Sequence, residues 1–197
     1  MSGPLILASA SPQRRDILAR VGLAFTVAPS GVEELGEGDP HEVAAENARR
    51  KALAAGAADP PDHDREAQPG HGPPLVLGAD TLVAIDGAIL GKPRDAAQAV
   101  DYVGRLAGRA HQVIGGIALA RDGALVAQAV EVTEVVFRAL SPVEIEAYVV
   151  LGEWEGRAGG YAIQGAGAAL VRSISGDYSN VVGLPLARLL DLLQTLD

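Results

Sequence analysis

The chain has 197 residues, of which 48% are hydrophobic and 21% charged, as expected of one globular domain with its own core. Its 25 acidic and 16 basic residues give a formal charge of −9, and 4% of residues are aromatic, so we expect no stable binding to nucleic acid. The absence of cysteine excludes disulfides, thiolate metal sites and a cysteine nucleophile.

The distribution of apolar segments predicts a cytoplasmic protein that does not enter membranes. No apolar run has the length of a membrane span, and no basic segment precedes the first apolar run as it would in a signal peptide. Strand and helix patterns alternate along residues 1–197, which favours a single α/β domain.

The opening of the chain predicts a buried strand that leads directly into a helix. Leu5–Ala8 is a short apolar run, and Pro12 suits the first helical position, with Ser11 as the expected N-cap. Ser9 and Ser11 place two hydroxyls at the helix N-terminus, and Arg14 brings a guanidinium. These groups could bind phosphate at the positive end of the helix dipole. The alternative is an ordinary turn with surface arginines.

A second strand and a second helix follow. Phe25–Ala28 predicts the strand, and a capping box that begins at Asp39 predicts a helix that ends near Ala55. The loop between them contains the adjacent glutamates Glu33 and Glu34. Such a pair is usually solvated, and a metal site is the alternative.

Residues 58–74 form a segment rich in proline, glycine and charge, without an apolar face. This composition predicts a flexible surface loop within the domain. The loop contains His63 and His71, but their spacing matches no zinc-finger pattern.

A hairpin is predicted over Leu75–Ile89, with its turn at Asp86 and Gly87. Asp80 lies in the middle of the apolar strand, where an unpaired carboxylate would be costly to bury. It either serves a metal ion or a catalytic proton, or it accepts hydrogen bonds from backbone amides. Lys92 follows in a rigid Gly–Lys–Pro turn that could bring it back towards Asp80.

The second half of the chain alternates helices and strands again. The predicted elements are a helix capped by Asp95, long strands at Gln112–Leu119 and Leu125–Phe137, a helix opened by Ser141, a strand at Leu170–Ile174, and a C-terminal helix with leucines at 186, 189, 190 and 193. The segment 152–171 is dense in glycine, which would let its backbone approach a ligand closely.

Four blocks together resemble the Maf family of nucleoside triphosphate pyrophosphatases. They occur in the family's order and span nearly the whole chain: LILASASPQRRDIL at 5–18, LGADTLV at 77–83 with LGKPRD at 90–95, GRAGGYAIQGAGA at 156–168, and GDYSNVVGLPL at 176–186.

The resemblance implies an α/β fold with a mixed, strongly bent sheet flanked by helices, and two lobes with a central cleft, as in inosine triphosphatases. It implies hydrolysis of a nucleoside triphosphate to the monophosphate and pyrophosphate with a divalent metal, usually Mg²⁺, with Mn²⁺ as the alternative. Homodimers are common in this family.

The resemblance also assigns roles to individual residues. The phosphate-binding turn corresponds to Ser9, Ser11 and Arg14, and the carboxylate that accepts a proton corresponds to Asp80. Glu34, Lys51 and Lys92 correspond to the acidic loop residue, the helix lysine and the turn lysine of the family. Asp80 and Glu34 are the candidate metal ligands.

Base selection is the least constrained part of this prediction. The dTTP/UTP branch of the family carries Thr after the catalytic Asp and Gln in the YxIQG loop, and Thr81 and Gln164 match both. That branch usually has Arg where this chain has Gln13, so we expect a broader preference for pyrimidine nucleotides. The alternatives are the same reaction on another or a methylated purine nucleotide, or a non-catalytic nucleotide-binding regulator of cell division.

Overall fold

The computed structural model describes residues 4–57 and 73–196, so the predicted loop over 58–74 lies almost entirely outside the described residues. The elements follow the chain in this order: β1 (Leu5–Leu7), α1 (Pro12–Arg20), β2 (Phe25–Val27), α2 (Pro40–Ala57), β3 (Leu75–Ile85), β4 (Ala88–Leu90), α3 (Ala96–Leu106), β5 (Ala110–Arg121), β6 (Ala124–Phe137), α4 (Pro142–Val150), the 3-10 turns η1 (Ala158–Gly160) and η2 (Ala166–Leu170), β7 (Val171–Ser175), α5 (Tyr178–Val182) and α6 (Leu186–Thr195). Every predicted helix and strand is confirmed, whereas α5 and the two 3-10 turns were not predicted. No helix within the described ranges is long and apolar enough to cross a bilayer.

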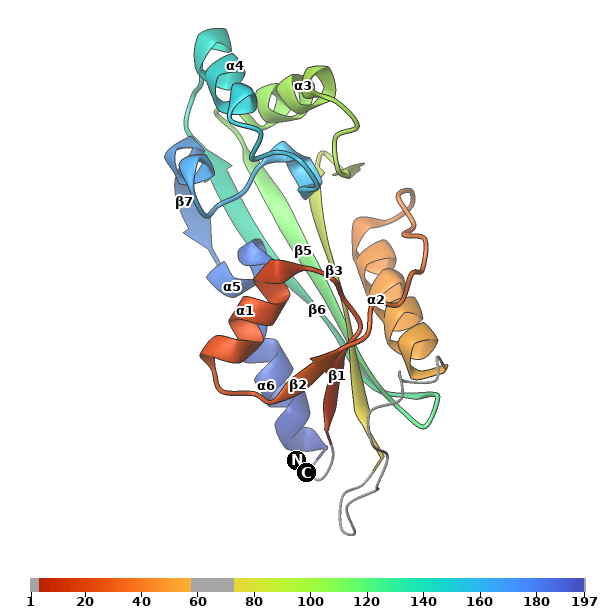
Figure 1. Cartoon of the computed structure of the whole chain (residues 1–197). Coiled ribbons are helices and arrows are strands. Elements are labelled where there is room, and N and C mark those ends of the chain that lie inside the picture. Colours follow the sequence, from red (N-terminus) through yellow and green to blue (C-terminus); the bar gives the residue numbers. More distant parts are fainter. Residues whose placement is uncertain (1–3, 58–72, 197) are drawn as a thin grey trace.

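The seven strands form one mixed sheet in the order β2-β1-β3-β5-β6-β7, with β4 paired to β3 (Figure 1). β1 is parallel to both β2 and β3, and all other pairs are antiparallel. β1 pairs with the beginning of β3, whereas β4 pairs with its end. The long strands β3, β5 and β6 therefore connect two halves of the molecule, as the predicted two-lobed fold requires.

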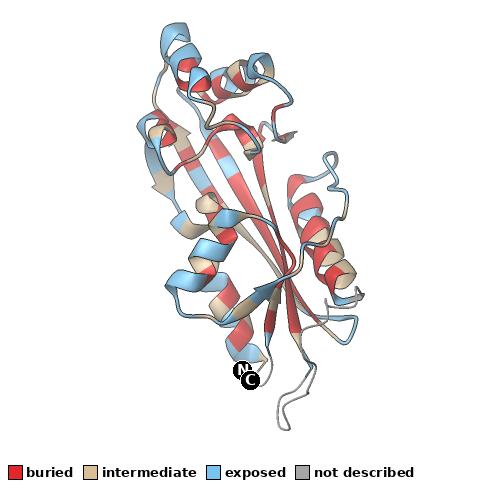
Figure 2. Cartoon of the chain, viewed as in Figure 1, coloured by how far each residue is buried: buried red, intermediate tan, exposed pale blue. Residues whose placement is uncertain are grey.

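The core is divided between these halves. One apolar cluster packs α3, α4 and the loop after α4 against the end of β3, and a second packs α1 and α6 against β1 and the beginning of β3. Helix α2 covers the opposite face of the sheet, where its inner side is buried (Figure 2). β3 and β5 are buried along most of their length because helices cover them on both faces, whereas most of β6 is partly or fully exposed.

Two glycines allow α2 to lie unusually close to the sheet. A Cβ added to Gly78 would clash with the backbone at Ala48, and one added to Gly116 would clash with the backbone at Ala44. Side chains on the inner face of α2 are thereby brought within hydrogen-bonding distance of β3.

Local signals account for most element boundaries. Asp95 caps α3 through the amide of Gln98, and Ser141 forms the predicted capping box of α4 with Glu144. The N-cap position predicted for α1 is confirmed, but the side-chain hydrogen bond expected of an N-cap residue is absent there. Ser11 occupies the N-cap position, but its hydroxyl donates to Gln13 Oε1 instead of accepting from the helix backbone.

Candidate active site

A cleft of about 750 Å³ opens between the two lobes. Its walls come from distant parts of the chain, namely residues 8–14, 29–32, 34, 51, 80–81, 83, 92, 113, 155–158, 161–164 and 181–183. All ten predicted site residues line this one cleft. Their proximity agrees with the prediction, but their individual roles stay predictions.

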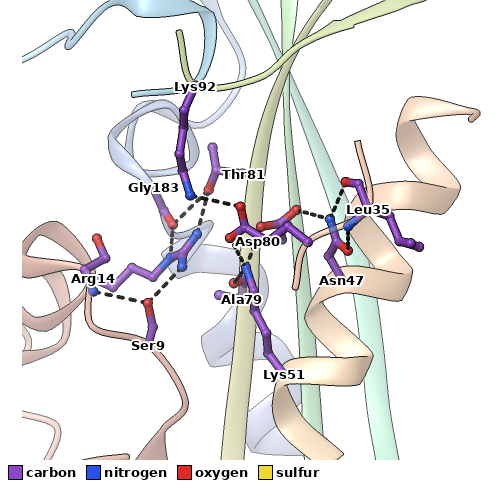
Figure 3. A network of polar contacts seen from close by, with 12 residues as sticks. Ser9, Arg14, Leu35, Asn47, Lys51, Ala79, Asp80, Thr81, Lys92 and Gly183 are labelled. Carbon is purple, nitrogen blue, oxygen red and sulfur yellow. Dashed lines mark hydrogen bonds and ion pairs between the residues drawn. The ribbon is translucent and has the colours of Figure 1, made fainter. Parts of the chain in front are cut away.

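Asp80 lines the cleft and is 3% exposed. Figure 3 shows it on β3, beside Lys51 and Asn47 of α2. Lys51 Nζ donates to Asp80 Oδ1 at 2.7 Å and to Glu34 Oε1 at 2.6 Å. Lys92 Nζ donates to the other oxygen of Glu34 at 2.9 Å. Two carboxylates and two ammonium groups thus form one chain of ion pairs, and Lys92 returns to the site from its turn as the sequence suggested.

The surrounding cations keep Glu34 ionised. Burial alone would raise the pKa of its carboxyl, but hydrogen bonds and charges from Lys51 and Lys92 lower this pKa to about 2. Glu34 therefore presents a full negative charge at neutral pH.

Asn47 is a member of this network that sequence analysis missed. It lies four residues before Lys51 on α2, and its Nδ2 donates to Asp80 Oδ2 at 2.9 Å. Its spacing from Lys51 on one helix face was the available signal, because residues four apart point in the same direction.

Arg14 is buried, so the interpretation of this residue as a surface arginine is wrong. Its guanidinium donates to Gly183 O at 2.9 Å, to Ser9 Oγ at 2.9 Å and to Thr81 Oγ1 at 3.2 Å. Burial lowers the pKa of Arg14, and the negative charges of Asp80 and Glu34 offset part of this effect. Arg14 thus joins α1, β3 and the end of α5 at the cleft wall.

The turn before α1 carries the remaining polar groups of this wall. Ser9 Oγ accepts from the backbone amide of Ser11 at 3.3 Å, and the Ser11 hydroxyl donates to Gln13 Oε1 at 3.1 Å. Gln13 is only partly exposed and lines the cleft, where a bound ligand could contact it.

The opposite wall is the loop that contains Gln164. Tyr148 Oη accepts from the amide of Ala162, and the Glu153 carboxylate accepts from the amides of Ala166 and Gly167 at 3.0 and 3.1 Å. Gln164 is exposed at the cleft.

One glycine of this segment, Gly159, serves packing. Gly159 has φ of +69°, and a Cβ there would lie 2.8 Å from the side chain of Val83. We expected the glycines to let this backbone approach a ligand closely, whereas at Gly159 the backbone approaches strand β3.

The donor set fits a magnesium ion bound together with a substrate. Within residues 4–57 and 73–196, no group of three or more His, Asp or Glu side chains could hold a metal by itself. Glu34 and Asp80 share Lys51, so their carboxylates lie near each other. Mg²⁺ is commonly held by one or two carboxylates, with phosphate oxygens and water completing its shell.

Comparisons with known proteins agree with this architecture. The sequence profile of the family described as Maf-like protein matches residues 4–196. A dTTP/UTP pyrophosphatase from Symbiobacterium thermophilum is 47% identical over 96% of this chain and 92% of that protein. One from Gloeobacter violaceus is 44% identical over 100% of this chain and 98% of that protein.

A solved structure supports the fold. The HAM1 protein from Coxiella burnetii superposes with a TM-score of 0.51 at 16% identity, covering 98% of this chain and 99% of that protein. The family profile spans nearly the whole described chain, and relatives above 40% identity align over more than nine tenths of it, so the chain belongs to the Maf-like protein family.

Proposed function

We propose that this protein is a nucleoside triphosphate pyrophosphatase that hydrolyses dTTP or UTP to the monophosphate and pyrophosphate. The observation that carries the proposal is the chain of ion pairs in the cleft, where Asp80 and Glu34 share Lys51 and Glu34 also binds Lys92. The names of the relatives, which are dTTP/UTP pyrophosphatases, support the choice of substrate.

The residues divide the chemistry between them. Water attacks the α-phosphorus, the bond to the oxygen that bridges to the β-phosphorus breaks, and pyrophosphate leaves. Asp80 holds the attacking water and accepts its proton, because each carboxylate oxygen retains a lone pair beside the hydrogen bond it already accepts. Lys51 and Lys92 neutralise the charge that develops on the leaving pyrophosphate.

A divalent cation completes the site in this proposal. Glu34 and Asp80 would hold Mg²⁺, or alternatively Mn²⁺, which would polarise the phosphate oxygens.

Base choice is assigned to the polar groups at the two walls. Gln13 and Gln164 line opposite sides of the cleft and can each donate to and accept from a base edge. Thr81 lies against Arg14 and Gly183, so it contributes by holding this wall in place. We further propose that the protein works in the cytoplasm as a homodimer and binds no nucleic acid.

The proposal is tested by product analysis in H₂¹⁸O. The purified protein is incubated with Mg²⁺ and with dTTP, UTP, CTP, ATP, GTP or methylated GTP in turn. We expect dTMP and UMP to form fastest and to carry the ¹⁸O, since water attacks the α-phosphorus. Label in pyrophosphate would exclude this mechanism. Nucleotide binding without hydrolysis of any triphosphate would instead identify a non-catalytic regulator.

A further inference from the structure

The amide of Asn47 connects the two acidic segments of the cleft. Its Nδ2 donates to Asp80 Oδ2 at 2.9 Å and to Leu35 O at 3.0 Å, while its Oδ1 accepts from Leu35 N at 2.8 Å. Leu35 follows Glu34 directly, so one side chain holds both the loop of Glu34 and the carboxylate of Asp80. Figure 3 shows this bridge.

Asn47 and Lys51 act on the same carboxylate from one face of α2. Lys51 binds Asp80 Oδ1 and Asn47 binds Asp80 Oδ2, so α2 occupies one lone pair of each oxygen. Lys51 also contacts Glu34 directly, but an ammonium group on a flexible stem fixes distance poorly. The three hydrogen bonds of the Asn47 amide are directional. Through this one buried side chain they link the backbone of Leu35 to the Asp80 carboxylate.

A second buried asparagine shows how different this arrangement is. Asn180 Nδ2 donates to Val113 O, Glu131 O and Thr133 Oγ1, which all belong to strands β5 and β6. Asn180 therefore fastens a helix to the sheet. Asn47 is as deeply buried, at 1% exposed, but two of its three hydrogen bonds hold a cleft loop and the third holds a cleft carboxylate.

We propose that Asn47 is a positioning residue that fixes the separation between Glu34 and Asp80, and thereby the affinity of the cleft for a divalent cation. The inference rests on the proposed function for its metal and substrate. Asn47 itself contacts neither of them. Substitution of groups that orient metal ligands typically weakens metal binding about 10- to 100-fold.

The test measures Mn²⁺ binding to the full-length protein by electron paramagnetic resonance, in the presence of non-hydrolysable α,β-imido-dUTP. Asn47→Ala should raise the half-saturating Mn²⁺ concentration at least about tenfold. Asn47→Leu removes the same hydrogen bonds but fills the volume, and it should give the same shift if the alanine variant folds poorly.

Gln128→Ala is the matched control. Gln128 Nε2 donates to Ala45 O, so this variant also removes an amide hydrogen bond that holds α2, but from β6 and away from both carboxylates. It should lower the melting temperature less than Asn47→Ala, because it loses one hydrogen bond instead of three, and it should leave Mn²⁺ binding unchanged. Equal Mn²⁺ affinities in the Asn47 and Gln128 variants would overturn the inference, as would a wild-type protein that binds no Mn²⁺.

A double-variant cycle tests whether Asn47 acts through Glu34. If it does, Asn47→Ala should weaken Mn²⁺ binding far less in a Glu34→Gln background than in the wild type. If Asn47→Ala weakens Mn²⁺ binding by the same factor in both backgrounds, Asn47 does not act through Glu34. Because Mn²⁺ binding is measured without turnover, a wild-type protein that binds Mn²⁺ but hydrolyses nothing would disprove the proposed function alone.

Discussion

A buried carboxylate is stable only where cations or hydrogen-bond donors compensate for lost hydration, and Asp80 has such a partner on each oxygen. Lys51 supplies the charge and Asn47 a neutral donor. This pairing accounts for an acidic residue in the centre of an apolar strand. It also holds the carboxylate at the lining of the cleft, where a proton acceptor or a metal ligand must lie.

Asp80→Asn should abolish most of the activity while leaving the fold intact. The amide keeps the size of the side chain but loses its charge and one acceptor, so we expect kcat for dTTP to fall about a hundredfold or more. Asp86→Asn is the matched control, because asparagine tolerates the φ of 53° at that exposed hairpin turn. Turnover near the wild-type value in a folded Asp80→Asn protein would remove Asp80 from the mechanism.

Gln13→Arg should sharpen the preference for pyrimidine nucleotides. Gln13 lines the cleft and is only partly exposed, and arginine would add a charged fork of donors at that place. One such contact discriminates bases by about 1–3 kcal/mol in other settings, or roughly ten- to a hundredfold. The measurement is kcat/KM for dTTP divided by that for GTP. If this ratio is unchanged or lower in the variant, Gln13 does not set base choice, and Gln164 becomes the residue to test.

At the scale of elements, each wall of the cleft is held by one charged side chain. Arg14 holds the wall formed by α1 and the end of α5, and Glu153 holds the loop that contains Gln164. The Glu153 carboxylate accepts hydrogen bonds from the backbone amides of Ala166 and Gly167, in the turn that follows Gln164. Both hydrogen bonds are charge-assisted, and such bonds contribute more than neutral ones. The position of Gln164 therefore depends on a side chain that does not itself line the cleft.

Glu153→Gln should loosen this wall. The amide can accept only one of the two backbone donors well, so we expect faster hydrogen exchange at Ala166 and Gly167. KM for dTTP should rise several-fold, with a smaller change in kcat because the ion pairs at Asp80 are untouched. Glu146→Gln, at an exposed position of α4, serves as the control. Unchanged exchange at the two amides would show that the turn does not need Glu153.

At the scale of the whole molecule, local signals were sufficient for the elements and insufficient for the contacts between them. The Asp–Gly turn of the β3–β4 hairpin has φ of 53° and 75°, as its sequence predicts. By contrast, the contact between Arg14 and Gly183 joins residues 169 positions apart, and no local pattern encodes it. Helix α5 escaped prediction because five residues show no helical periodicity.

The same distinction applies to the site. Asp80 was identifiable because a charge interrupts an apolar strand. Asn47 has no such contrast with its surroundings, since a polar residue in a helix usually faces solvent. Its importance depends on the close approach of α2 to the sheet at Gly78, which only the fold reveals.

His111 makes the stability of the whole fold depend on pH. It is 3% exposed, packs edge-on against Phe137 and Tyr161, and its Nε2 lies 2.9 Å from Tyr161 Oη. Burial lowers the pKa of His111 from 6.5 to about 4. The unfolded chain therefore binds a proton at a pH where the folded protein does not, and stability is lost as the pH falls from about 6.5 towards 4.

The expected loss between pH 7.5 and pH 5 is about 2 kcal/mol of unfolding free energy from this residue. Glu34 contributes little in this window, since its lowered pKa of about 2 causes losses only below its ordinary value near 4.5. Urea unfolding of the wild type and of His111→Gln at both pH values isolates the effect. The variant cannot titrate, so its unfolding free energy should fall about 2 kcal/mol less than that of the wild type on acidification. Parallel losses in the two proteins would mean that His111 becomes protonated in the folded state as readily as in the unfolded chain.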